Sequence, residues 1–155
     1  MASILSNELI EAINAQDSLK LVTAVDKSGL PHSAYKGSLH INAEGNIVFY
    51  DIFESSKINS NLVYSIWFNK KVTVNILTND RQSYEIVGLP IQSITAGKVF
   101  EEVYKKLKRD KNSDLNAIWI IKPEEVRNET FLIRKEQQEK EYPLLKHLDR
   151  ILKED

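Results

Sequence analysis

The sequence of 155 residues has no cysteine, and it has only five glycines and four prolines. The absence of cysteine excludes disulfides, thiolate nucleophiles and thiolate metal sites, and it is compatible with a reducing cytoplasm. With so few glycines there is neither a GxGxxG nor a GxxxxGKS/T motif, which excludes the usual dinucleotide-binding and P-loop phosphate sites. Any phosphate site must therefore be built from side chains and the ends of helices.

The chain also lacks an excess of charge of one sign and a long apolar run. Its formal net charge is −1, so we predict no overall electrostatic attraction to nucleic acid or to an acidic membrane. No stretch reaches about 18 consecutive apolar residues, and the N-terminus has no basic segment followed by an apolar one. We therefore expect a cytoplasmic protein without a signal peptide or a membrane span, folded as one domain over residues 1–155.

The residues that usually support hydrolase chemistry are missing. There is no HExxH motif, no GxSxG motif and no recognisable grouping of serine, histidine and aspartate. The three histidines are His32, His40 and His147. Along one extended strand the first two would lie roughly 26 Å apart, too far to share a metal ion. We expect no metal site, and neither a metal hydrolase nor a serine hydrolase is predicted.

Short apolar runs separated by turn residues predict a β-barrel of six or seven antiparallel strands. Gly88 and Pro90 interrupt one run, which indicates a bulge or an edge strand. Pro123 is expected to end another. The predicted strands cover residues 19–25, 31–41, 47–52, 72–77, 83–94, 115–121 and 126–134.

Apolar residues at helical spacing predict helices around this barrel. The fold class is therefore α+β, mainly β, with a barrel core over about residues 17–131. The aromatic residues Trp67, Trp119 and Phe131 are expected in the core or at an interface. Helices are predicted after Ser6 or Asn7, after Ser55 or Ser56, over residues 97–109, and after Pro143 within the charged C-terminal segment 136–155.

Residues 30–41 carry the first part of a possible binding site. Strand alternation places Tyr35 and Leu39 on one face and Lys36 and Ser38 on the other, which is polar and cationic. A flat strand surface with a cationic edge suits a planar ligand that carries a negative charge. An exposed lysine on a half-buried strand is also common in proteins without any such ligand.

Residues 49–62 carry the second part, the end of a strand followed by a helix that begins with Ser55, Ser56 and Lys57. The free N–H groups and the dipole of a helix start attract an anion, and serine and lysine side chains add further donors. The same residues are also typical of an ordinary N-cap followed by a solvated lysine. Taken together, the two segments predict a phosphate site beside a strand surface, as a phosphorylated aromatic cofactor requires.

Five short motifs follow one another along the chain. They are Gly29-x-Pro31, Tyr35-Lys36-Gly37-Ser38, Ser56-Lys57-x-x-x-Asn61-Leu62, Lys71-Val-Thr-Val-Asn75 and Trp119-Ile-Ile-Lys-Pro123-Glu-Glu-Val126. In this order and spacing they resemble the pyridoxamine 5′-phosphate oxidase-like, FMN-binding split-barrel family. The resemblance covers about residues 17–131.

The resemblance implies a six-stranded split barrel that forms a homodimer and binds FMN at the subunit interface. Residues 35–38 would line the flavin ring, partly through their backbone groups, and residues 50 and 51 would lie near the ribityl chain. The phosphate would be held at residues 55–57. The implied cofactor contacts are Tyr35, Lys36, Gly37, Ser38, Tyr50, Asp51, Ser55, Ser56, Lys57 and, on the next strand, Asn75.

The C-terminus departs from that of true pyridoxamine-phosphate oxidases, which have a substrate-binding region rich in arginine and histidine. The flavin itself carries hydrides and electrons in such enzymes, so no residue of this sequence identifies itself as catalytic. We expect a flavin-dependent reductase or oxidase that acts on a small-molecule substrate or electron donor. Alternatives are a non-catalytic FMN binder or sensor, a haem-handling barrel with an axial histidine, and a barrel without cofactor that serves as an interaction module.

Overall fold

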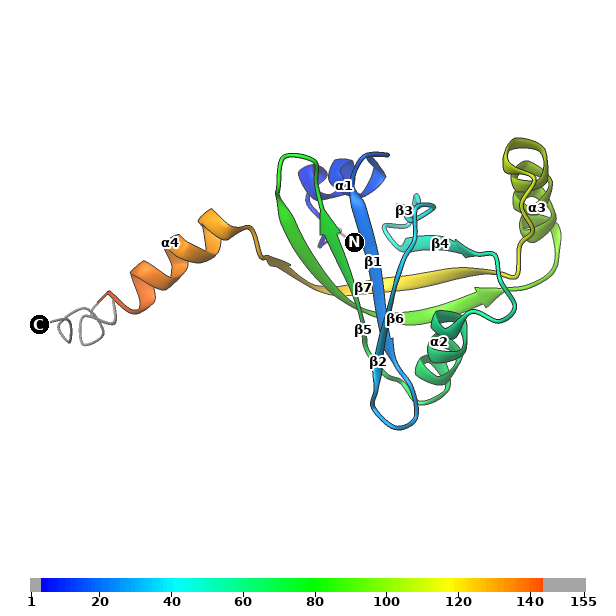
Figure 1. Ribbon diagram of the computed structural model, residues 1–155, viewed down its shortest axis with the longest axis horizontal. Helices are drawn as coiled ribbons and strands as arrows, with labels where there is room; N and C mark the ends of the chain where they lie inside the picture. The colour runs from blue at the N-terminus through cyan, green and yellow to red at the C-terminus, as the bar shows by residue number, and fades with distance from the viewer. Residues whose placement is uncertain (1–3, 144–155) are drawn as a thin grey trace, which may run out of the picture.

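The computed structural model describes residues 4–143, which form one curled antiparallel sheet with helices around it (Figure 1). Its seven strands lie in the order β2-β1-β5-β6-β7-β4-β3. The predicted α+β class, mainly β, is confirmed, with seven strands where the family resemblance implied six. The elements are α1 (Asn7–Asn14), β1 (Leu19–Val25), β2 (Pro31–Tyr35), β3 (His40–Ile41), β4 (Ile47–Asp51), α2 (Lys57–Trp67), β5 (Val72–Leu77), β6 (Ser83–Ile94), α3 (Lys98–Lys111), β7 (Ala117–Asn128) and α4 (Phe131–Glu141).

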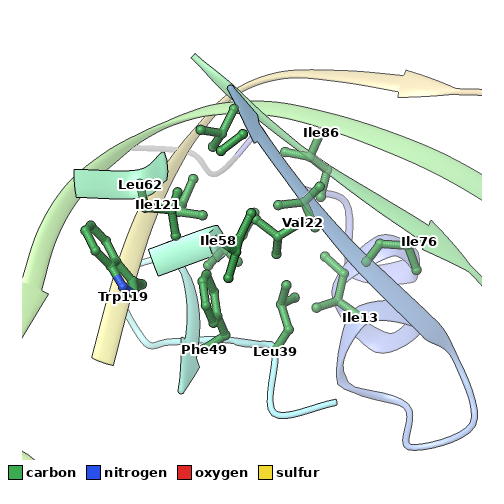
Figure 2. Packing of buried hydrophobic residues seen from close by; sticks show 14 of the residues in the cluster. Ile13, Val22, Leu39, Phe49, Ile58, Leu62, Ile76, Ile86, Trp119 and Ile121 are labelled. Atoms are coloured by element: carbon green, nitrogen blue, oxygen red, sulfur yellow. The ribbon is translucent and has the colours of Figure 1, made fainter. Parts of the chain in front are cut away.

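The main core fills the inside of the curl (Figure 2). Strand alternation explains it, because Val72, Val74 and Ile76 on β5 are buried while the residues between them are not. Helices α1 and α2 contribute their apolar sides to the same core. Labelled members in Figure 2 are Ile13, Val22, Leu39, Phe49, Ile58, Leu62, Ile76, Ile86, Trp119 and Ile121.

A second, smaller cluster lies on the other face of the sheet, beneath α3. It is made of Val48, Leu115 and Ile118, with partly buried apolar residues of α3 packed against it. The run at residues 115–121 is therefore apolar on both faces because β7 separates two clusters, as the prediction of a central strand required.

The long strands β6 and β7 pair with two irregularities, between Val87 and Gly88 and between Pro90 and Gln92. This confirms the bulge predicted at Gly88 and Pro90. A Cβ atom on Gly88 would lie 2.7 Å from Ile121 Cγ2 and 2.7 Å from the Lys122 carbonyl oxygen. Only glycine allows the two strands to approach this closely.

Replacing Gly88 with alanine should therefore lower the free energy of unfolding by about 1–3 kcal/mol, because the backbone of β7 has to shift to accept the methyl group. Urea denaturation at a fixed protein concentration measures the loss. Gly37→Ala is the matched control, since a Cβ atom there meets nothing within 4 Å. Equal stability of the two variants would contradict the close approach.

The C-terminal part of the sequence prediction is wrong in two places. Pro123 does not end a strand, because β7 passes through it: Gly88 pairs with Pro123 and Val87 with Glu125, so Glu124 is the extra residue of a bulge where proline is tolerated. The strand predicted at residues 126–134 ends at Asn128, and α4 begins at Phe131. The helix predicted after Pro143 lies outside the described residues.

Within residues 4–143, no helix is both long enough and apolar enough to cross a membrane.

Candidate functional site

The segment predicted as one strand over residues 31–41 is broken in the middle. Strand β2 ends at Tyr35, the Lys36 N–H donates to the Lys20 carbonyl (2.9 Å), and the Leu39 N–H donates to the Lys36 carbonyl (3.1 Å). This turn ends the alternation, so the predicted shared face of Tyr35 and Leu39 is wrong. The Tyr35 side chain is 70% exposed, whereas Leu39 is in the core. The estimated separation of the two histidines, which assumed a continuous strand, loses its basis as well.

The turn directs Lys36 inward, where it pairs with a buried carboxylate. Its ammonium lies 3.1 Å from Asp51 Oδ1 and 5.6 Å from the centroid of the Phe49 ring. The Lys36 side chain is only 13% exposed, and Asp51 is completely buried. Asp51 Oδ2 has no hydrogen-bond partner among the described residues. The pair joins the end of β2, at one edge of the sheet, to the end of β4, near the other edge.

Ser38, His40 and Tyr50, close in sequence to this pair, contact one another. The Tyr50 N–H donates to Ser38 Oγ (2.9 Å), and His40 Nδ1 lies 2.8 Å from the Ser38 carbonyl oxygen. The rings of His40 and Tyr50 meet edge to face at 5.7 Å. Burial raises the pKa of the Tyr50 hydroxyl, so this group stays protonated at neutral pH. Gly37 is exposed with open space around it.

At the start of α2, Ser56 is the N-cap and its hydroxyl accepts a hydrogen bond from the Asn59 N–H (3.1 Å). The ordinary capping role is therefore present for Ser56. The first turn of α2 has no acidic residue of its own, so the negative charge near its positive end comes from outside the helix. Ser55 is exposed and lines an open cavity of about 660 Å³, together with Phe53 and, from the end of α3, Lys111.

Lys57 is half exposed, and its ammonium lies 3.6 Å from Asp26 Oδ2. Asp26 Oδ1 accepts hydrogen bonds from the Ser28 hydroxyl (2.6 Å), the Ser28 N–H (2.8 Å) and the Leu30 N–H (3.1 Å). These hydrogen bonds lower the pKa of Asp26 to about 2, and the bond from the Ser28 hydroxyl has the largest effect. Because Asp26 stays ionised above about pH 4, an anion at Lys57 must compete with this carboxylate.

A hollow of about 210 Å³ lies on the outer face of the sheet, and we call it the outer hollow. It brings together Tyr35 and Asn75, which are forty positions apart in the sequence. Strand pairing explains this, since Leu21 on β1 is opposite Tyr35 on one side and opposite Asn75 on the other. The lining residues are Leu19, Leu21, Tyr35, Asn75, Ile76, Leu77 and Ser83.

The predicted contacts therefore form three groups. Five form a group that we call the junction, made of the Lys36–Asp51 pair and its sequence neighbours Gly37, Ser38 and Tyr50. Three form the start of α2, and two lie in the outer hollow. The junction and the helix start are linked, because Phe49 is opposite Trp119, whose indole N–H donates to Asn59 Oδ1 in the first turn of α2 (2.8 Å). The outer hollow is more distant: from Leu21 to Asp26 the chain covers roughly 17 Å.

Some candidate residues were missed by sequence reasoning. Leu19, Leu21 and Leu77 give the outer hollow its apolar wall. Their signal was present, because the run at residues 19–25 has apolar residues on both faces, whereas a strand with one face in water usually alternates between apolar and polar residues. Lys111 had no such signal, since it lies in a helix with many charged residues. Among residues 4–143 there is no group of three or more side chains able to hold a metal ion.

Neither a known protein-family model nor a curated protein matches the chain. Solved structures do match. HupZ from Group A Streptococcus has a TM-score of 0.68 and 21% identity, covering 83% of this chain and 96% of its own. An FMN-binding protein from Syntrophomonas wolfei has a TM-score of 0.64 and 16% identity, covering 79% and 84%. A putative pyridoxamine 5′-phosphate oxidase from Lactobacillus delbrueckii has a TM-score of 0.60 and 14% identity, covering 79% and 93%.

The matches also include HutZ, the heme storage protein from Vibrio cholerae, with a TM-score of 0.54 and 15% identity over 80% of this chain and 94% of its own. At these identities the comparisons establish the fold. The chain has the split-barrel fold of FMN-binding and pyridoxamine 5′-phosphate oxidase-like proteins, as its motifs predicted.

Proposed function

We propose that this chain binds FMN as a homodimer and acts as a flavin-dependent oxidoreductase on a small molecule. The outer hollow is the observation that carries the proposal. It combines an exposed aromatic ring, Tyr35, with leucine side chains and one amide, Asn75. An apolar wall with few polar groups suits a flat heteroaromatic ring that has hydrogen-bonding atoms at its edge.

The start of α2 fits a phosphate group. Backbone N–H groups at a helix start, the exposed Ser55 hydroxyl and the half-exposed Lys57 ammonium are all donors. Bound phosphate would draw Lys57 away from Asp26, which now holds it at 3.6 Å. In the junction the Ser38 hydroxyl accepts from the Tyr50 N–H, and Tyr50 precedes the buried Asp51 in the sequence; these polar groups suit the hydroxyl groups of a ribityl chain.

The open side of the outer hollow supports the homodimer. Leu19 is 53% exposed there, next to the exposed ring of Tyr35. A second copy of the chain that covered this face would exclude water from a bound ring. FMN supplies the transfer of hydride or electrons when it is bound, and the residues of this chain hold and orient it. A cytoplasmic location stays a prediction.

Replacing Lys57 with alanine should weaken FMN binding by about ten- to hundredfold, because a hydrogen bond to a charged group is worth about 1.5–3 kcal/mol. Fluorescence quenching during titration with FMN measures the dissociation constant. Riboflavin, which lacks the phosphate, is the control ligand, and its affinity should not change. Asp26→Asn keeps the acceptor Oδ1 and should tighten FMN binding, since it removes the competing charge.

An ultraviolet–visible spectrum of the purified protein, with mass identification of any released chromophore, tests the cofactor directly. Colourless protein that shows no thermal shift with FMN would overturn the proposal. Anaerobic reduction by NADH or NADPH followed by reoxidation distinguishes an enzyme from a binder, because a pure binder reacts only stoichiometrically. If the chain is a barrel without cofactor, Lys57→Ala leaves every measured property unchanged.

A haem-handling role is the second candidate, because the fold is also that of a heme storage protein. It requires an axial ligand. Nδ1 of the half-buried His40 is engaged with the Ser38 carbonyl, which leaves Nε2 for a metal. His32 is half buried on β2, and His147 lies outside the described residues. Haem titration without a shift of the Soret band would exclude this role.

A further inference from the structure

The first turn of α4 exposes three large apolar residues in succession. Phe131 is 74% exposed, Leu132 is 65% exposed and Ile133 is also exposed. No residue of α4 is buried, and Figure 1 shows the helix leading away from the barrel with no other described element against it. Such a cluster on an isolated helix is an unpartnered apolar surface, which indicates an interaction site.

The base of α4 is held firmly, so its direction is set by the fold. Thr130 is buried, and its hydroxyl accepts a hydrogen bond from the Ser83 N–H (3.0 Å). The Glu129 N–H donates to the Ser83 carbonyl (2.8 Å), and Arg134 lies 3.4 Å from Glu129. These contacts fix the first turn of α4 against the start of β6. Since Ser83 also lines the outer hollow, α4 begins at the rim of that hollow.

Two apolar surfaces of the same chain are thus adjacent, and no element within residues 4–143 covers them. The helix leads away from its own barrel (Figure 1), and none of its residues is among those that line the hollow. In a twofold dimer the contact is reciprocal: whatever one copy places on its partner, the partner places on it. A segment that leaves one copy at the rim of the shared face is therefore placed to reach the partner, and the matching segment of the partner reaches back in the same way.

We propose that α4 of each copy packs its first turn against the rim of the outer hollow of the partner and so completes the cofactor site. This inference rests on the homodimer of the proposed function. The charges of α4 do not oppose it, because Arg134, Lys135 and Lys140 balance Glu136, Glu139 and Glu141. Phe131 and Leu132 supply the apolar contact, and Leu19 and Tyr35 receive it.

The absence of native cysteine allows a direct test. Two full-length single variants, Leu132→Cys on α4 and Leu19→Cys at the hollow, carry different tags, are mixed and are treated with a short bis-maleimide at low protein concentration. We expect a covalent heterodimer, which can arise only between chains. Val99→Cys mixed with Leu19→Cys is the control, because Val99 is exposed on α3, at the other end of the molecule from α4 (Figure 1).

A second measurement uses substitution in place of cross-linking. The double variant Phe131→Ser, Leu132→Ser should raise the dimer dissociation constant about tenfold or more, measured by sedimentation or light scattering over a dilution series. It should leave the far-ultraviolet circular dichroism spectrum unchanged, because neither side chain is buried. Val99→Ser is the matched exposed control and should not affect association.

The outcomes separate this inference from the function on which it rests. A chain that is monomeric at every concentration overturns both the homodimer and the exchange of α4. A dimer without the cross-link between positions 132 and 19, and unaffected by the double substitution, overturns the exchange alone. A cross-linked dimer that binds neither FMN nor riboflavin supports the exchange and overturns the cofactor proposal.

Discussion

Replacing Lys36 with methionine should lower the free energy of unfolding by about 3–5 kcal/mol. The substitution leaves the Asp51 carboxylate completely buried without its ion-pair partner, while Oδ2 of the same group already has no hydrogen bond. Removing one member of a buried pair costs more than the pair contributes, because the remaining charge stays desolvated. Urea denaturation at pH 7 and a fixed protein concentration measures the loss.

Two further variants test whether the loss of stability comes from the unpaired buried charge of Asp51. The double variant Lys36→Met, Asp51→Leu removes both charges and should recover most of the lost stability, since an apolar pair often replaces a buried ion pair without cost. Lys57→Met is the matched control: its ammonium is half exposed beside Asp26, so the change should stay within about 0.5 kcal/mol. If Lys36→Met and Lys57→Met have the same small effect, water reaches the junction and the pair is not buried in solution.

Replacing Trp119 with alanine should also lower the free energy of unfolding by about 3–5 kcal/mol, because this fully buried side chain leaves a large cavity in the core. The indole N–H also holds Asn59 in the first turn of α2 (2.8 Å). The loss therefore extends to the helix start that we propose for the phosphate. We expect weaker binding of FMN in addition to a lower urea midpoint.

Trp119→Phe separates the contribution of core packing from that of the hydrogen bond to Asn59, since it keeps most of the apolar volume and removes the indole N–H. Its cost should be about 1–3 kcal/mol, the usual range when a polar partner is left unsatisfied. Trp67→Ala is the control for residue type, because Trp67 is exposed at the end of α2 and should change stability little. Equal losses for the alanine and phenylalanine variants at position 119 would contradict the cavity argument.

The parts of the fold that depend on local pattern were predictable from the sequence. The predicted strands at residues 19–25, 72–77 and 83–94 coincide with β1, β5 and β6. In each, residues that face the core alternate with residues that do not, and the sequence shows this period directly. The start of α2 at Ser56 was equally predictable, since a capping serine acts within one turn of the helix.

The features that local pattern missed depend on partners distant in sequence. The break after Tyr35 accompanies the ion pair between Lys36 and Asp51, fifteen positions away. The run from Phe131 to Ile133 has the composition of a strand. However, the pairing of β7 with β6 ends at the pair Asn128–Tyr84, and the chain continues from Phe131 as a helix. No local pattern shows where a sheet stops pairing, because that depends on the register of the other strand.

The same reason limited the prediction of the site. The individual residues were named, but their division into three groups follows from the order of strands in the sheet. Tyr35 and Asn75 meet because β1 lies between β2 and β5. The Lys57 side chain had appeared free for an anion, whereas the turn after β1 places Asp26 beside it.

The segment that contains α3 can change in length and sequence without disturbing the sheet of the barrel. Ile94 and Ile118 are opposite each other at the end of the β6–β7 ladder, so the whole segment that contains α3 leaves the sheet and returns to it at one point. Such a connection tolerates changes of length and sequence, because its two ends are already held together by the strands. Lineages that share the barrel can therefore elongate, shorten or replace α3 beside Ser55, provided that the apolar patch at Val48 and Ile118 stays covered.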